Sequence, residues 1–329
     1  MITEIQRELE VARRQSVARV ARRVLECFST GSAALEDDVL ERHPLAALVH
    51  RVALREGPAG RSVIQAVNDT LSVRAARDTE RIRTRKLVGL QCPFVLPARE
   101  TRDAALAPAA VGEAELEAAL DRHADAVASV MPDWWFPYVG IATSYTAVTI
   151  NGCPAPSRFS GTFSDAFGAI HAVIPEATET YVEVLTHEAG HLWLNLLEDR
   201  DPTFVRNPYT EQRFVSPWRQ DARPIHGILH GAYVFSVAVP ALLAVRTEAA
   251  RARAVQLAVR VRDAVRQVLT YGSLSAEATA VAAAAGARVE ALATELGAEA
   301  VATADELYRR DKEQKVRRLM YSHPDLQVV

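Results

Sequence analysis

The chain has 329 residues, a formal net charge of −3 and a hydrophobic content of 49%, which is enough for a sizeable core in one or two domains. The near-neutral charge provides no basic field for nucleic acid, so we expect no nucleic-acid partner. The cysteines, Cys27, Cys92 and Cys153, are odd in number and lack metal-ligand spacing. They indicate a reducing compartment without disulfides.

No targeting or membrane segment is evident in the sequence. Residues 1–10, MITEIQRELE, contain no apolar stretch of the kind that a signal peptide carries. The longest apolar run, near 231–245, contains Pro240 and is shorter than the ~20 residues of a membrane span. We therefore expect a cytoplasmic protein that does not enter a membrane.

Helices are predicted before residue 130 and strands after it. Apolar residues recur at helical spacing through residues 1–90, and a further helix is expected around 113–130. The β-branched stretch IATSYTAVTI and the alternating stretch that ends at Pro175 predict the strands of a small sheet. His171 is expected to be an ordinary strand residue. The last strand either pairs with an extended peptide or is already paired on both sides.

An HExxH motif, His187 to His191, follows within a predicted helix, TETYVEVLTHEAGHLWLNLLE. Residues four apart share one helix face, so His187 and His191 can bind one divalent metal ion with Glu188 beside them. The motif therefore predicts a metalloenzyme with a zincin-like metal helix.

A third metal ligand is expected from the segment SPWRQDARPIHGILHGAYVF, which holds His226 and His230. His230 opens an apolar run that indicates a buried helix beginning just after Pro224. We favour His230 because a ligand in the first turns of that helix can face the HExxH pair. His226, closer to the loop, is the alternative.

Two enzyme classes use such a site. In a zinc metallopeptidase, Glu188 is the general base for a metal-activated water. The metzincin extension fails because residues 194 and 197 are leucine, and neither Glu198 nor Glu211 has a convincing helical frame as a glutamate third ligand. A non-haem Fe(II) oxygenase instead needs three ligands on one face of the metal and open positions for a cosubstrate.

Two arginines suit the second class. A 2-oxoacid cosubstrate needs a cation for its distal carboxylate, and arginine binds carboxylates in a bidentate fork. Arg219 and Arg223 directly precede the predicted third ligand. Alternatively, either arginine forms a local salt bridge with Asp221. A non-catalytic reading is a structural metal with four protein ligands, His226 being the fourth.

The HEAGH motif and the segment PWRQDARPIHGILHGAYVF resemble the HExxH-motif peptide-modification proteins encoded beside ribosomally made, modified peptides. The resemblance covers roughly residues 180–240. It implies an Fe(II)- and 2-oxoglutarate-dependent hydroxylase that acts on a β-carbon of a precursor peptide. Some members of that family carry Gln at the position of His230 and His at the position of Phe235.

After residue 246 the chain is rich in alanine and arginine, and helices are predicted to about residue 320. These helices either pack over the metal region or form a homodimer face. We expect a mainly α (α+β) fold with the HExxH helix beside a small sheet, surrounded by N- and C-terminal helices. Its regions are 1–90, helical; 91–246, the metal-binding core; and 247–329, helical, with all three in one domain as the alternative.

The sequence thus predicts Fe(II) bound by His187, His191 and His230, and 2-oxoglutarate held by Arg219 or Arg223. The substrate is a ribosomally made peptide, hydroxylated at a β-carbon. Zinc and peptidase chemistry with Glu188 as base are the alternative.

Overall fold

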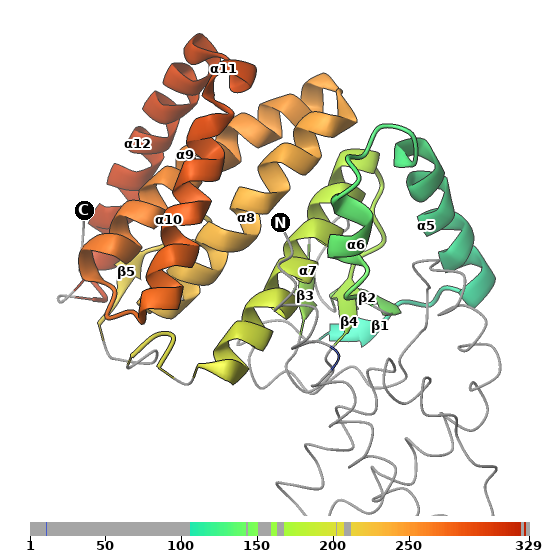
Figure 1. Cartoon of the computed structure of the whole chain (residues 1–329), viewed down its shortest axis with the longest axis horizontal. Coiled ribbons are helices and arrows are strands. Elements are labelled where there is room, and N and C mark those ends of the chain that lie inside the picture. Colours follow the sequence, from blue (N-terminus) through green and yellow to red (C-terminus); the bar gives the residue numbers. More distant parts are fainter. Residues whose placement is uncertain are drawn as a thin grey trace, which may run out of the picture. The chain divides into compact units, whose positions relative to one another are not determined.

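The computed structural model describes two compact parts of the chain (Figure 1). The first unit comprises Met1–Ser129 and Phe136–Ala177, and the second Val130–Trp135 and Thr178–Val329. The described residues are Val11, 106–142, 144–150, 159–162, 168–201, 203–206, 212–323 and 326. Apart from Val11, the helices predicted in residues 1–90 lie outside them.

The first unit contains a four-stranded mixed sheet in the order β1-β2-β4-β3. Its elements are β1 (Leu106–Pro108), α5 (Glu113–Val127), β2 (Ser144–Ile150), β3 (Ser160–Thr162) and β4 (Ala169–Ala172). Strands β2 and β4 run parallel, whereas β1 and β3 pair antiparallel at the two edges. The helix α6 (Trp135–Val139) begins at the boundary of the two units.

Strand β4 is an inner strand, and all four of its residues are buried. His171 lies in it, opposite Thr146 of β2 and Gly161 of β3. Because neighbours occupy both edges of β4, this strand has no free edge for an extended peptide. The structure therefore favours the second of the two readings of this segment, a strand paired on both sides.

The second unit is mainly helical. Its elements are α7 (Thr178–Arg200), β5 (Phe214–Val215), β6 (Ala222–Arg223), α8 (Ile225–Val245), α9 (Glu248–Tyr271), α10 (Ala276–Ala291), α11 (Ala293–Leu296) and α12 (Ala298–Met320). Local sequence sets several of these boundaries. Thr247 and Ser275 cap α9 and α10 by accepting hydrogen bonds from backbone N–H groups three residues later. Arg246, in the left-handed region at φ 62°, ends α8.

Helix α8 is the centre of this unit and packs against α7, α9 and α10 (Figure 1). Ile228, Leu229 and Leu242 of α8 are fully buried in the shared core, and each such side chain contributes about 1.5–3 kcal/mol of hydrophobic stabilisation. The core continues through α9 into α10, where the residues are mostly alanine and valine. Small side chains let these helices approach closely.

Among the described helices, α8 is the one that is long and apolar enough to cross a membrane, with 21 residues from Ile225 to Val245. It is longer than the apolar run expected from the sequence because it begins before His226. Of its most apolar window, 67% is buried inside the protein. A helix with neighbours on several sides is apolar all round, so the packing accounts for its composition.

The mainly α fold with a small sheet is confirmed. The sheet and α7 belong to different units, so the position of the metal helix beside the sheet remains a prediction. The division at residues 90 and 246 remains one too.

Candidate metal centre

Helix α7 carries four residues of types that bind metals: His187, His191 and Glu198 in a polar stripe on one face, and Glu188 beside them. His187 and His191 are one turn apart, and Glu198 follows His191 by seven residues, which is about two turns. Glu188 adjoins them and is 1% exposed. The apolar residues of α7 are buried around these positions, so the helix is held by its core contacts and presents the polar stripe from a rigid element.

The N-terminal half of α8 brings two more histidines to this stripe. Nδ1 of His230 lies 3.1 Å from Nδ1 of His191, whose Nε2 lies 3.2 Å from Nε2 of His187. Two nitrogens bound to one ion at ~2.1 Å are about 3.0–3.4 Å apart. Each separation alone has that size, but the two involve opposite nitrogens of the His191 ring, so the three imidazoles adjoin one another without presenting one nitrogen each to a common point.

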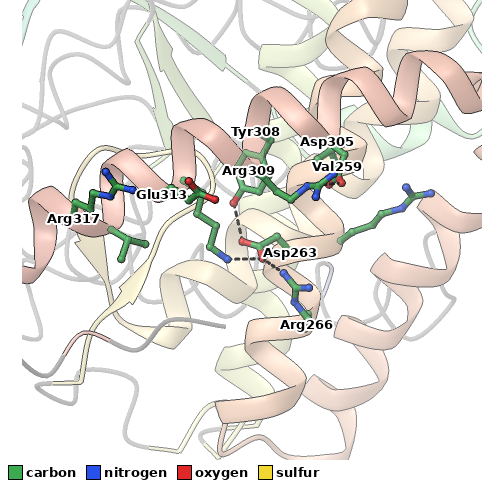
Figure 2. Close-up of a pocket in the computed structure, with 11 residues that line it drawn as sticks. Val259, Asp263, Arg266, Asp305, Tyr308, Arg309, Glu313 and Arg317 are labelled. Carbon is green, nitrogen blue, oxygen red and sulfur yellow. Dashed lines mark hydrogen bonds and ion pairs between the residues drawn. The ribbon is translucent and has the colours of Figure 1, made fainter.

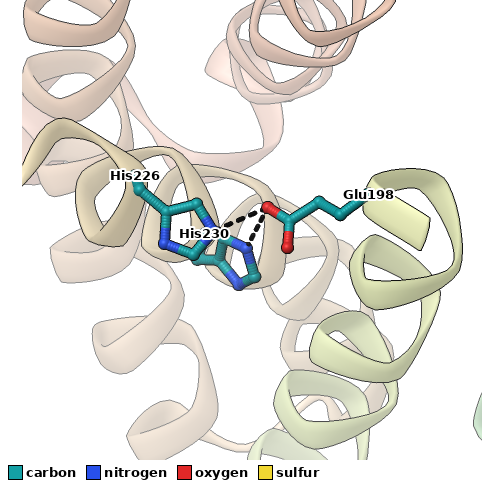
Figure 3. A group of neighbouring side chains, drawn as sticks. All are labelled: Glu198, His226 and His230. Atoms are coloured by element: carbon teal, nitrogen blue, oxygen red, sulfur yellow. Dashed lines mark hydrogen bonds and ion pairs between the residues drawn. The ribbon is translucent and has the colours of Figure 1, made fainter. Parts of the chain in front are cut away.

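Glu198 joins the two histidines of α8. Its Oε1 lies 2.7 Å from Nε2 of His226 and 2.8 Å from Nε2 of His230. Figure 3 shows the carboxylate reaching across to the two imidazoles, which share one face of α8. The three potential ligand atoms lie within 4.8 Å of one another, so these residues form a group that is able to hold a metal ion.

The hydrogen bonds form one directional chain. A carboxylate only accepts, so His226 and His230 both donate from Nε2 to Glu198. A neutral His230 then accepts at Nδ1 from Nδ1–H of His191, which accepts at Nε2 from His187. Each ring in the chain needs only one proton, while Nδ1 of His187 is buried without a hydrogen-bond partner among the described residues.

Burial keeps His187, His191 and His230 neutral. It lowers the pKa of His187 to about 4 and that of His191 well below its usual value. Burial also lowers the pKa of His230, although its hydrogen bond to Glu198 acts in the opposite direction. Burial alone would raise the pKa of Glu198, but hydrogen bonds from His226 and His230 lower it to about 2. Neutral imidazoles and an ionised carboxylate are the forms that bind metals.

Two aromatic rings, those of Phe235 and Trp218, connect His187 to the PWR segment, residues 217–219. The ring of Phe235 lies 4.4 Å from that of His187, centroid to centroid, and Trp218 stacks on Phe235 at 4.9 Å. Nε1 of Trp218 is buried and has no hydrogen-bond partner among the described residues. Such a donor costs about 1–3 kcal/mol if it stays unpaired, so an acceptor atom of a ligand is favoured next to Nε1 of Trp218.

Close packing holds Trp218 against α8. A Cβ at position 231 would come within 2.4 Å of Cζ3 of Trp218, so this approach requires Gly231. Gln267 of α9 donates to the carbonyl of Val215, and Lys315 of α12 donates to that of Ser216. The C-terminal helices therefore hold the segment that carries Trp218.

Both predicted cosubstrate arginines lie beside Asp221, as the salt-bridge alternative expected. Nε of Arg219 is 3.1 Å from Asp221 Oδ1, and Nε of Arg223 is 3.0 Å from Asp221 Oδ2. The side chain of Arg219 is 64% exposed, against 34% for that of Arg223. Arg223 is thus the more enclosed cation, in the strand directly before α8.

A separate cavity of about 760 Å³ lies between α9 and α12 (Figure 2), and no histidine lines it. Asp263 is its buried centre and binds Lys312, Arg266 and Tyr308 at 2.8, 2.5 and 2.7 Å. The ion pairs and hydrogen bonds satisfy the carboxylate, and the arrangement joins α9 to α12. We assign this group a structural role.

Glu198 is the ligand-type residue that the sequence reasoning set aside. Its spacing from His187 and His191, eleven and seven residues, was the available signal, because both intervals return to the same helix face. His226 was considered as a substitute for His230 or as the fourth ligand of a structural metal, and in the structure both histidines reach Glu198. A comparison of the chain with protein-family models and with curated proteins finds no match.

Proposed function

We propose that the protein is an Fe(II)- and 2-oxoglutarate-dependent enzyme that hydroxylates a side-chain β-carbon of a ribosomally made precursor peptide in the cytoplasm. The observation that carries the proposal is the contact of three neutral imidazoles, His187, His191 and His230, from two packed helices. Imidazoles and carboxylates suit Fe(II) and Zn(II) alike, so the residues fit the ion. When bound, Fe(II) with 2-oxoglutarate and O2 supplies the oxidising power for an unactivated C–H bond.

His187, His191 and His230 would hold the ion. His191 presents Nε2 to His187 and Nδ1 to His230, so its ring must turn for all three to bind one ion. Glu198 accepts from Nε2–H of His230, which fixes the tautomer and leaves Nδ1 of that ring as the ligand atom. This carboxylate therefore orients the third ligand.

The resemblance to HExxH-motif peptide-modification proteins agrees with this placement. In that family the residue at position 230 or the one at position 235 supplies the third histidine. In this chain the rings at both positions adjoin the HExxH histidines. The PWR segment adjoins them too, through Trp218 and Phe235. The two sequence blocks that carry the resemblance thus meet around one site in the second unit.

Arg223 is the better candidate for the distal carboxylate of 2-oxoglutarate. It is more enclosed than Arg219, and its ion pair with Asp221 uses Nε, while a guanidinium has two further nitrogens for a carboxylate. The buried Nε1–H of Trp218 offers another donor to an oxygen of the cosubstrate or substrate.

The second candidate is a zinc metallopeptidase. Glu188 supports it, because its buried carboxylate has Oε1 3.8 Å from Nε2 of His187, close enough to serve as general base for a water on the ion. Glu188→Gln separates the two classes. It abolishes peptidase turnover, where the base is essential, but only weakens an oxygenase in which Glu188 orients the site.

Anaerobic reconstitution tests the proposal without knowledge of the peptide. Apo-protein with Fe(II) and 2-oxoglutarate should develop a weak visible charge-transfer band, and admission of air should yield succinate by slow uncoupled turnover. The same mixture with His187→Gln protein is the control and should give neither. Peptide cleavage by the zinc form, without cosubstrate and lost in Glu188→Gln, would instead establish the peptidase.

A further inference from the structure

The α7–α8 interface offers more ligands than one ion uses. Three imidazoles account for the proposed iron centre, yet Glu198 and His226 adjoin it with ligand atoms 2.7 Å apart. A protein site for a catalytic metal ion typically uses three side chains. The two additional groups are a carboxylate and an imidazole, which both bind metals, and the proposed iron centre does not explain their presence.

We propose that Glu198, His226 and His230 form a second site for a first-row transition-metal dication. Two histidines and one carboxylate are the ligand set of many non-haem iron sites. The site goes beyond the proposed hydroxylase activity, because it stands on these three side chains whether or not the HExxH pair binds iron.

The geometry of the three ligand atoms supports the site. Oε1 of Glu198 lies 2.7 and 2.8 Å from the two Nε2 atoms, and neighbouring ligands of one ion at ~2.1 Å are about 3.0–3.4 Å apart. Opening each contact by a few tenths of an ångström therefore admits an ion. Because His226 and His230 are one turn apart on α8, their rings reach the carboxylate from the same side.

Accessibility and charge also fit a metal site. The side chains of Glu198, His226 and His230 are 24%, 21% and 11% exposed, so an ion can enter while the ligands stay partly shielded. The carboxylate contributes a negative charge, which the two histidines of the HExxH pair lack.

His230 links the two sites. Its Nε2 faces Glu198 and its Nδ1 faces His191, so one ring has a nitrogen for each ion. If both sites were filled, each nitrogen of this ring would serve one ion. Each ion keeps positions for water or substrate, since neither site has more than three protein ligands.

Metal stoichiometry tests the inference on the full-length apo-protein. Co(II) is titrated anaerobically, its visible absorption is followed, and bound metal is measured after desalting. Wild-type protein should bind two equivalents. Glu198→Gln and His226→Gln should each bind one, and the double variant His187→Gln/His191→Gln should keep one equivalent at the remaining site.

The control is His123→Gln, a histidine of α5 in the first unit, which should still bind two equivalents. Circular dichroism verifies that each variant is folded. A single equivalent in the wild type overturns the inference and leaves Glu198 and His226 as residues that only hold His230. Loss of all binding in the HExxH double variant, or unchanged binding in both Glu198→Gln and His226→Gln, overturns it as well.

The outcome is separate from that of the proposed function. Two equivalents without a 2-oxoglutarate band would refute the hydroxylase and leave the second site standing. One equivalent with a band and succinate would do the reverse.

Discussion

Gly231→Ala tests how the PWR segment is packed against the helix that carries His230. An added Cβ would lie 2.4 Å from Cζ3 and 2.7 Å from Cε3 of Trp218, whereas carbon atoms pack at about 3.5–4.0 Å. The indole must therefore recede by about 1 Å. Overpacking of this kind costs about 1–3 kcal/mol, against a gain of about 1 kcal/mol in helix propensity. We expect a net loss of about 0–2 kcal/mol in the free energy of unfolding.

Gly227→Ala is the matched control on the same helix. Its Cβ would meet only Cβ of Arg223, at 3.9 Å, which is an ordinary contact. It gains the same helix propensity without the clash, so it should stabilise by up to about 1 kcal/mol. The difference between the two variants isolates the packing of Trp218 and should be about 1–3 kcal/mol.

Urea unfolding followed by circular dichroism measures this difference, with equal m values as the check on a common mechanism. Metal affinity is the second readout. Displacement of Trp218 disturbs Phe235 and the ring of His187 behind it, so Gly231→Ala should also weaken metal binding while Gly227→Ala leaves it unchanged. The reasoning is refuted if Gly231→Ala is as stable as Gly227→Ala.

Further predictions concern three other groups. Burial lowers the pKa of His171 to about 4 in the folded protein, against about 6.5 in the unfolded chain. The unfolded chain therefore binds the proton first, and the free energy of unfolding, which is unaffected above pH 6.5, falls by up to about 3 kcal/mol as the pH falls toward 4. His171→Gln should flatten the stability difference between pH 7 and pH 4.5, and an unchanged difference would contradict the assignment. Asp263→Asn leaves the buried Lys312 without its counter-charge and should cost about 3–5 kcal/mol; addition of Lys312→Met should restore most of it, and a single variant of wild-type stability would count against the network. Arg223→Lys should weaken 2-oxoglutarate binding about tenfold, measured by the charge-transfer band, because lysine lacks the bidentate fork; equal losses in Arg219→Lys would reject our choice between the arginines.

The helix that carries His187 and His191 was predictable because its evidence is local. The HExxH spacing and the apolar residues around it specify both a helix and the face that binds a metal. The same holds for β2, where β-branched residues determine the strand. Local periodicity needs no knowledge of the partner element, and the structure confirms the helix and the strand. The metal-binding role of the helix face stays a prediction.

Contacts between elements were harder to predict. The sequence does not specify which turn of α8 faces α7, so the choice between His226 and His230 rested on their distance from Pro224. Both histidines in fact reach Glu198. Gly231 likewise has no local explanation in a helix. Its need for a bare backbone comes from Trp218, which is thirteen residues earlier and belongs to a different element.

The polar residues of α8 carry a signal in the sequence that predicts contacts between helices. A helix with neighbours on several sides must be apolar nearly all round, and a polar group buried there costs free energy unless it has a partner. Each exception on α8 should therefore have a specific partner. Ser236 accepts from Arg288 at 2.5 Å, and His226 and His230 both donate to Glu198 of α7. On a helix this apolar, two histidines one turn apart indicate a facing carboxylate or metal ion. The preceding long helix, α7, carries such a carboxylate at Glu198, on the same face as His187 and His191.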